Sequence, residues 1–177
     1  MNSVKRLPII LIPIILILGC SRNAPLPVAK NMVVSKYLGR WYEIARIPNS
    51  FEAGLACVTA TYSMRPDKKI DVLNKGYTVV GDSARVKIAH GIARIPDTLV
   101  QAKLKVKIAG PFYANYQVIA LGDNYEYAVV GTPSRKYLWI LSRTPHINDD
   151  LYNSLVKLAG DNGFNVKQLE KINQNCL

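Results

Sequence analysis

The sequence predicts an all-β protein: an eight-stranded, up-and-down antiparallel β-barrel with one C-terminal α-helix packed outside it. Eight segments that alternate apolar and polar residues follow one another between residues 41 and 142, with turn residues between them. Short, evenly spaced strands are typical of a barrel, whose closure removes the exposed edges of the sheet. The only strong helical periodicity comes after the last of these segments. A chain of 177 residues, of which 49% are apolar, has room for one such domain.

The first expected strand begins at Trp41, directly after a short helical turn that ends at Gly39. Glycine readily adopts the positive φ that ends a helical turn, so the chain can pass there from helix into strand. Alternation along the strand predicts two faces, with Trp41, Glu43 and Ala45 on one and Tyr42, Ile44 and Arg46 on the other.

Seven further strands are expected from the alternation of apolar residues and the turn residues between them. They are Thr59–Met64, Ile70–Tyr77, Ala84–Ala93, Ala102–Ile108, Tyr116–Leu121, Glu126–Gly131 and Tyr137–Ser142.

The helix is expected to begin with Asn148 or Asp149 as its cap and to stop at Gly163. Its apolar face consists of Leu151, Leu155, Leu158 and Ala159. The segment Phe164–Leu169 is a candidate for a final short strand.

The amino terminus is expected to be a secretion signal. Two basic residues precede an apolar run that is too short to span a bilayer and ends at Gly19-Cys20. A small residue directly before a cysteine resembles the lipobox of bacterial lipoproteins, which implies that Cys20 becomes the acylated first residue. Ordinary cleavage beside an unrelated cysteine is the alternative. Residues 1–19 are then the signal peptide, 20–33 the acylated amino terminus and a tether, and 34–177 the folded domain.

The net charge of +11 is spread along the chain, and no nucleic-acid motif accompanies it. A solvated basic surface is the simplest interpretation, and attraction to anionic lipid headgroups is the alternative. His90 and His146 are the only histidines and lack metal-ligand spacing, so neither a metal nor a cofactor is expected. His90 is interpreted as a barrel residue, with a proton donor in a pocket as the alternative. No nucleophile elbow is present, which favours a binding protein over an enzyme.

Several stretches of the chain resemble the lipocalins, and among them the bacterial outer-membrane lipocalins and the apolipoprotein D-like subgroup. Gly39-Arg40-Trp41 is similar to the first signature of that family, and Arg143 is similar to its third. The second signature is reduced here to Gly122-Asp123-Asn124-Tyr125. The other matching stretches are Tyr37–Arg46, Thr59–Met64, Asn74–Tyr77, Gly110–Tyr113, Val118–Leu121 and Tyr137–Pro145.

The resemblance implies that Gly39, Trp41 and Arg143 form a structural lock at the base of the barrel. A guanidinium over an indole ring is favourable, and it can also donate to strand carbonyls. These three residues are therefore not expected to contact a ligand.

The resemblance also implies an outer-membrane lipoprotein whose calyx binds a fatty acid or a lysophospholipid, with the barrel facing the periplasm. Ser21 agrees with the outer membrane. In bacterial lipoproteins that this segment resembles, a signal for retention in the inner membrane has Asp at that position. Alternation from the matched motifs turns most of the candidate ligand residues toward the barrel axis, and Tyr113 lies near the mouth. The candidates are Tyr62, Val72, Asn74, Tyr113, Val118, Ala120, Trp139 and Leu141.

Other readings of the interior remain open. Small residues on the expected inner faces favour an open cavity, namely Ala45, Ala60, Ala120 and Ala128. The alternatives are a structural lipoprotein whose barrel is filled by its own side chains, and a carrier of another hydrophobic ligand such as a tetrapyrrole. Asn74 needs a partner, which is a neighbouring side chain, water or a ligand headgroup. A homodimer is also an option.

The remaining two cysteines are expected to form a disulfide. With Cys20 acylated, Cys57 and Cys176 are an even pair in an oxidising compartment. The apolipoprotein D-like subgroup resembles this chain in joining the second strand to the carboxy-terminal tail.

Overall fold

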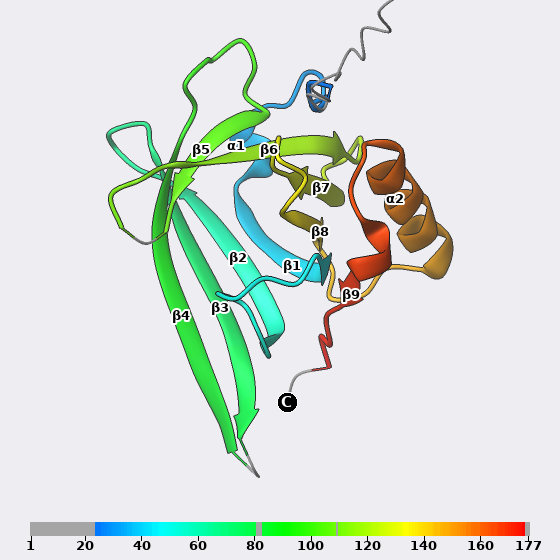
Figure 1. Cartoon of the computed structure of the whole chain (residues 1–177). Coiled ribbons are helices and arrows are strands. Elements are labelled where there is room, and N and C mark those ends of the chain that lie inside the picture. The colour runs from blue at the N-terminus through cyan, green and yellow to red at the C-terminus, as the bar shows by residue number, and fades with distance from the viewer. Residues whose placement is uncertain (1–23, 81–82, 109, 176–177) are drawn as a thin grey trace, which may run out of the picture.

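The structure is a computed structural model that describes residues 24–80, 83–108 and 110–175. Its sheet is antiparallel, the strands from β2 to β8 neighbour one another in chain order, and β1 closes the barrel by pairing with both β8 and β2 (Figure 1). The predicted fold class is therefore confirmed. The eight barrel strands are β1 Gly39–Arg46, β2 Ala56–Met64, β3 Ile70–Val80, β4 Ser83–Arg94, β5 Lys103–Lys107, β6 Ala114–Leu121, β7 Tyr127–Gly131 and β8 Leu138–Ser142.

The two α-helices lie where the sequence predicts helical structure. The short helix α1 (Val34–Tyr37) precedes Gly39, whose φ of +93° requires a residue without a side chain. The helix α2 (Asp149–Asp161) begins at Asn148, whose Oδ1 accepts a hydrogen bond from the backbone N–H of Leu151 at 2.8 Å. Figure 1 shows α2 outside the barrel.

The expected strand at Phe164–Leu169 is wrong. A 3₁₀-helix, η1 (Val166–Gln168), occupies that segment, and the additional strand β9 (Glu170–Lys171) follows it. Phe164 is buried against Gly131, where it fills the place that a side chain would otherwise take. Because this packing fixes the segment against the outside of β7, pairing with β1 starts only at Glu170.

Two β-bulges change which face several residues occupy. In β1 the register shifts between Glu43 and Ala45, and in β6 it shifts between Val118 and Ala120. Each bulge adds a residue, so the alternation of side chains is interrupted there. Ala45 and Ala120 consequently pack in the outer cluster below α2, whereas strict alternation predicts that they face the barrel axis. Arg46, expected on the outer face, instead lies opposite Trp139 on the inner face.

The apolar core consists of two clusters on opposite sides of the sheet. The outer cluster joins β1, β6, β7 and β8 to α2, and includes Leu155, Ala159 and Phe164. The inner cluster fills part of the barrel, and its buried members are Met32, Tyr37, Trp41, Tyr62, Ile70, Val72, Ala93, Ala102, Leu104, Val106, Val118, Ala128, Val130 and Leu141.

The amino-terminal segment before α1 packs against the barrel, although a tether is expected there. Leu26 is buried in the outer cluster and Met32 in the inner one, and the N–H of Ala29 donates to Val118 O at 2.8 Å. These buried apolar side chains hold residues 24–33 in place. The predicted signal peptide and Cys20 lie outside the described residues. No helix in the described ranges is both long and apolar enough to cross a membrane.

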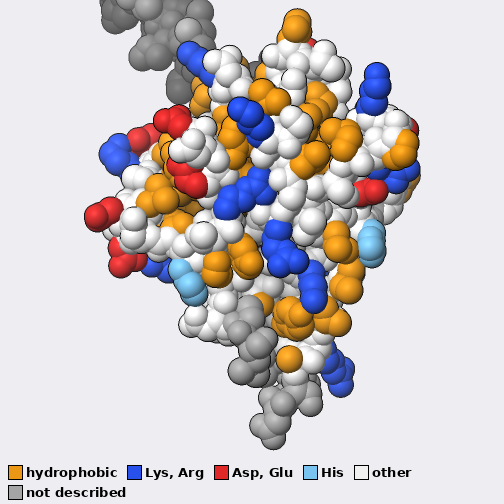
Figure 2. All heavy atoms as spheres, turned by 180° about the vertical axis from the view of Figure 1, so that it is seen from behind, with side chains coloured by type: hydrophobic (Ala, Val, Ile, Leu, Met, Phe, Trp, Pro, Cys, Tyr) orange, Lys and Arg blue, Asp and Glu red, His pale blue; other side chains and the backbone are white. Residues whose placement is uncertain are grey.

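The barrel has a closed end, covered by α1, and an open end, where β1 stops and β8 starts. The hairpin of β3 and β4 extends well beyond the other strands at the open end (Figure 1). Among the described residues, β4 pairs with β5 only at Ile92–Arg94, so its first half has β3 as its only neighbouring strand. On the face seen in Figure 2, Lys and Arg side chains are interspersed with apolar ones.

Candidate ligand site inside the barrel

The interior of the barrel is the candidate ligand site. Six of the sequence-predicted ligand residues share its inner face, as the strand registers and the inner cluster place them. They are Tyr62, Val72, Asn74, Val118, Trp139 and Leu141. Asn74 lies between Ala60 of β2 and Ala89 of β4, so small side chains flank its amide.

The closed half of the interior is filled by three tyrosines. The hydroxyl of Tyr116 is 2.7 Å from that of Tyr37 and 2.9 Å from that of Tyr62, so the three form a hydrogen-bonded chain. The ring of Tyr37 packs on Trp41, with centroids 4.9 Å apart. Burial raises the pKa of Tyr62 to about 12, and it also raises the pKa of Tyr37 and Tyr116, so all three stay neutral at physiological pH.

The closed end is held by Arg143, which lies over Trp41. Its guanidinium carbon is 3.8 Å from the indole centroid. The same guanidinium donates to the backbone carbonyls of Arg40, Lys36, Tyr37 and Tyr125, at distances from 2.8 to 3.3 Å. A Cβ at Gly39 would lie 3.3 Å from Nη1 of Arg143, so the glycine also leaves room for this side chain. The structure thus brings together the three residues predicted to form the lock.

The open half of the interior contains a buried, hydrogen-bonded pair, Glu43 and Arg46. Arg46 and Glu43 are 2% and 3% exposed, and Arg46 Nη1 donates to Glu43 Oε1 at 2.8 Å. Arg46 Nη2 also donates to Leu55 O at 3.3 Å, and Nε is 3.0 Å from Oε1 of Glu170 without the geometry of a hydrogen bond. Burial and the negative charge of Glu52 raise the pKa of Glu43 to about 8, although Arg46 opposes the shift.

The connection between β1 and β2 folds over the open end. Trp139 Nε1 donates to Glu52 Oε2 at 3.0 Å, and the rings of Phe51, Tyr137 and Trp139 lie within 6.5 Å of one another, measured between centroids. Lys87 of β4 donates from Nζ to Phe51 O at 2.7 Å. The mouth therefore combines aromatic rings with charged groups.

Two predicted ligand residues do not face the interior. Ala120 lies opposite Val129 and packs in the outer cluster, because of the bulge in β6. Tyr113 lies just before β6, with its ring 4.8 Å from the guanidinium carbon of Arg94 and 5.6 Å from Nζ of Lys107. Arg94 follows the inward-facing Ala93, so this cluster belongs to the outer surface.

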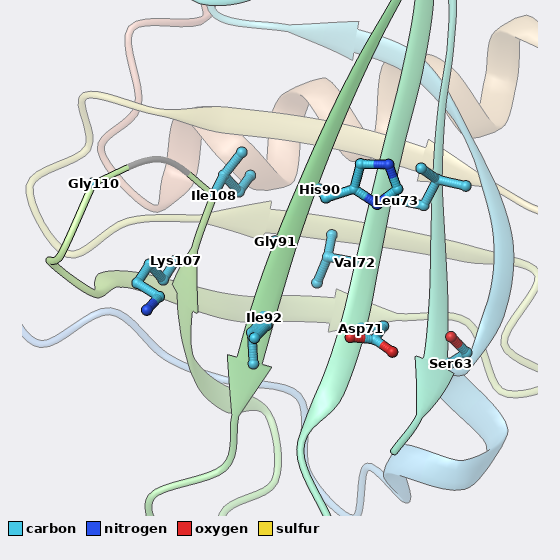
Figure 3. A pocket seen from close by; sticks show the side chains of 10 residues that line it. All are labelled: Ser63, Asp71, Val72, Leu73, His90, Gly91, Ile92, Lys107, Ile108 and Gly110. Atoms are coloured by element: carbon cyan, nitrogen blue, oxygen red, sulfur yellow. The ribbon is translucent and has the colours of Figure 1, made fainter.

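A hollow of about 520 Å³ lies on the outer side of β2, β3 and β4 (Figure 3). One row across it consists of Ser63, Asp71, Ile92 and Lys107, which oppose one another on successive strands. His90 and Leu73 form a second row, and His90 is exposed. In the described ranges no three His, Cys, Asp or Glu side chains are grouped so that they could hold a metal ion.

Arg46, Glu52 and Lys87 lie at the mouth, although the sequence pattern does not predict them there. The charge of Arg46 is unusual for a barrel interior, and only the bulge in β1 turns it inward. The inward position of Lys87 could have been predicted from the register of the β3–β4 hairpin, because Lys87 lies two residues before Ala89, which is on the inner face.

Cys57 lies where the carboxy-terminal tail meets β2. Its N–H donates to Asn173 O at 2.8 Å, and Gln174 Nε2 donates to the carbonyls of Glu43 and Val58. Cys176 is outside the described residues, so the Cys57–Cys176 disulfide stays a prediction. The contacts of Asn173 and Gln174 bring the tail to the strand that contains Cys57.

A closed eight-stranded antiparallel barrel with a helix outside it defines the class of up-and-down β-barrels with a calyx. Residues 32–174 match the family described as the lipocalin-like domain, so the chain belongs to the lipocalin family. It is 43% identical over 162 residues to the outer membrane lipoprotein Blc of Escherichia coli K12, with 90% of each chain covered.

More distant relatives and solved structures agree with this family. Mouse apolipoprotein D is 35% identical over 159 residues, covering 85% of this chain and 82% of that protein. Insecticyanin from Manduca sexta has a similar fold, with a TM-score of 0.65 and 23% identity, covering 85% of this chain and 84% of that one. Lobster apocrustacyanin A1 also shares the fold, with a TM-score of 0.61 and 18% identity, covering 80% and 79%.

Proposed function

We propose that the protein is an outer-membrane lipoprotein, acylated at Cys20, whose barrel faces the periplasm and binds a fatty acid or a lysophospholipid. The similarity to outer membrane lipoproteins supports the location. The observation that carries the ligand class is the inner face of the barrel, where Val72, Val130, Trp139 and Leu141 contribute to an apolar wall. This wall leads to the mouth.

Burial of an acyl chain against this apolar wall would be sufficient for micromolar affinity. Burying about 16 methylene groups gains at most roughly 13 kcal/mol, at about 0.8 kcal/mol for each group. Association and ordering costs of several kcal/mol reduce this to an affinity in the micromolar range. Because the wall is apolar, we expect weak discrimination between acyl chains of similar length.

A structural lipoprotein with a filled barrel is the second candidate. The tyrosine chain and Trp41 occupy the closed half, and the Glu43–Arg46 pair occupies part of the open half. If these side chains leave no room for an acyl chain, the protein acts through its surface. Both histidines are exposed, so neither supports the tetrapyrrole alternative with an axial ligand inside the barrel.

Titration with a fluorescent fatty acid distinguishes the two candidates. We expect saturable micromolar binding by the wild-type protein. Val130→Trp adds a large side chain opposite Trp139 and should abolish binding while circular dichroism still shows a folded barrel. His90→Trp adds the same side chain on the outer surface and should bind normally. Absence of saturable binding by the wild-type protein would favour the structural lipoprotein.

The anchor is tested separately by membrane fractionation. Cys20→Ala removes the acylated residue, and we expect the folded variant in the soluble fraction, because several acyl chains hold a bacterial lipoprotein firmly. A variant that stays in the membrane pellet would contradict acylation at Cys20.

A further inference from the structure

The β3–β4 hairpin presents two cations on the face that continues the barrel interior. Arg85 lies opposite Thr78, and Lys87 lies opposite Gly76. Gly76 shows which way this face points. A Cβ at Gly76 would lie 3.1 to 3.3 Å from the side chains of Val58 and Leu55, and both of these side chains are buried. Side chains alternate along a strand, so Arg85 and Lys87 share the inner face with Ala89 and Asn74.

The contact of Lys87 agrees with this placement and does not depend on the register. Its ammonium donates to Phe51 O at 2.7 Å, although β2 and β3 lie between β4 and the loop that contains Phe51. Gly76 has no side chain, and Val58 and Leu55 pack over it on the same face. The ammonium of Lys87 therefore lies at the mouth, on the backbone carbonyl of Phe51, whose ring is 6.5 Å from that of Trp139 between centroids.

Arg85 and Lys87 have no acidic partner among the described residues. Within the part of the chain that the structure describes, neither Arg85 nor Lys87 is in an ion pair, whereas Arg65 near the closed end pairs with both Asp67 and Asp71. Of the acids near the mouth, Glu52 already accepts hydrogen bonds from Trp139 and Asn49. Burial keeps Glu43 largely protonated at neutral pH, because its pKa is raised to about 8. Arg85 and Lys87 therefore present positive charge at the mouth that is available to an anionic group.

We propose that Arg85 and Lys87 bind the phosphate of a single-chain lipid whose acyl chain enters the calyx past Trp139. This inference rests on the proposed function and specifies its ligand as a monoacyl lipid with a phosphate monoester. Residues i and i+2 of a strand are about 7 Å apart, which a group with several anionic oxygens can bridge. A phosphate monoester carries nearly two negative charges at neutral pH, whereas a carboxylate carries one.

Competition against a bound fluorescent fatty acid tests the proposal. Three competitors share one acyl chain and differ in the headgroup: a monoacylglycerol phosphate, a free fatty acid and an uncharged monoacylglycerol. For the wild-type protein we expect the phosphate to bind about tenfold more tightly than the uncharged lipid, and we expect added salt to reduce that ratio. Arg85→Gln/Lys87→Gln should bring the ratio close to one.

A matched control removes the same charge from the other face. Lys75 is opposite Ile88 on the outside of the same hairpin, and Lys103 is exposed on β5, so Lys75→Gln/Lys103→Gln should keep the wild-type ratio. Lys87 also holds the loop of Phe51, so its loss could lower the affinity for all three competitors. This effect cancels in the ratio of the affinities for the phosphate lipid and the uncharged lipid. Arg85→Gln alone has no such contact and should reduce the ratio about threefold.

The outcomes separate this inference from the proposed function. A double variant that keeps the wild-type ratio, or a control that loses it equally, would overturn the role of Arg85 and Lys87. Equal affinity of the wild-type protein for all three lipids would overturn this inference alone. No saturable binding of any lipid would overturn the proposed function together with it.

Discussion

The two ends of the barrel are built from different chemistry. At the closed end, neutral rings pack on one another, and Arg143 donates to four backbone carbonyls. At the open end, a buried Glu43–Arg46 pair, the Trp139–Glu52 hydrogen bond and Lys87 hold the structure together. The closed end should therefore be insensitive to pH and salt, whereas the open end should respond to both.

The largest expected effect concerns the covalent tie at the open end. Reducing the predicted Cys57–Cys176 disulfide should lower the free energy of unfolding by up to about 4–5 kcal/mol, because it releases a long loop in the unfolded chain. Urea unfolding of the mature protein with and without a reductant measures the difference. Cys176→Ser should reproduce the reduced protein, and identical curves, or two free thiols in the oxidised protein, would contradict the disulfide.

Removing the Arg143 contacts at the closed end should lower the free energy of unfolding without changing the affinity for lipid. Arg143→Ala removes the contact with Trp41 and leaves four carbonyls without this donor, so we expect a loss of about 2–3 kcal/mol. Lipid affinity should stay within a factor of about two, because the tyrosine chain separates Arg143 from the open half. If affinity fell sharply while stability was unchanged, Arg143 would instead belong to the ligand site.

The pH dependence of stability should come from the open end. The folded protein holds the proton of Glu43 up to about pH 8, whereas the ordinary value is 4.5, so the folded state binds more protons between these values. The stabilisation is complete below pH 4.5 and is lost as pH rises through 8. Glu43→Gln should flatten thermal-unfolding midpoints measured across this range. An equal slope in the variant would assign the dependence to another group.

The smallest expected effect is at the loop over the mouth. Trp139→Phe removes the hydrogen bond to Glu52 but keeps an aromatic ring, so stability should fall by about 1 kcal/mol. Amide exchange of residues 49–55 should become faster, while that of β7 stays unchanged. Unchanged exchange in the loop would mean that the contacts of Phe51 and Lys87 hold it without Trp139.

The closed end was the easier of the two to predict from the sequence. Gly39, Trp41 and Arg143 are recognisable by residue type, and the structure places them together. The open end was harder, because a bulge cannot be read from alternation. Arg46 and Ala45 exchange faces at the bulge in β1, and Ala120 turns outward at the bulge in β6. Tyr37 and Tyr116 were missed as interior residues, since their hydroxyls meet only after the barrel closes.

The strand order, the outer helix and the lipocalin family can be predicted from the sequence, because periodicity, turn residues and local motifs depend on neighbours along the chain. The positions of the amino-terminal segment and the carboxy-terminal tail, and the choice of charges that enter the barrel, depend on contacts between distant parts of the chain. Leu26 and Gln174 find their partners on strands that are distant in sequence. The inward side of Arg46 depends on the pairing of β1 with β8, and a single extra residue in one strand reverses it.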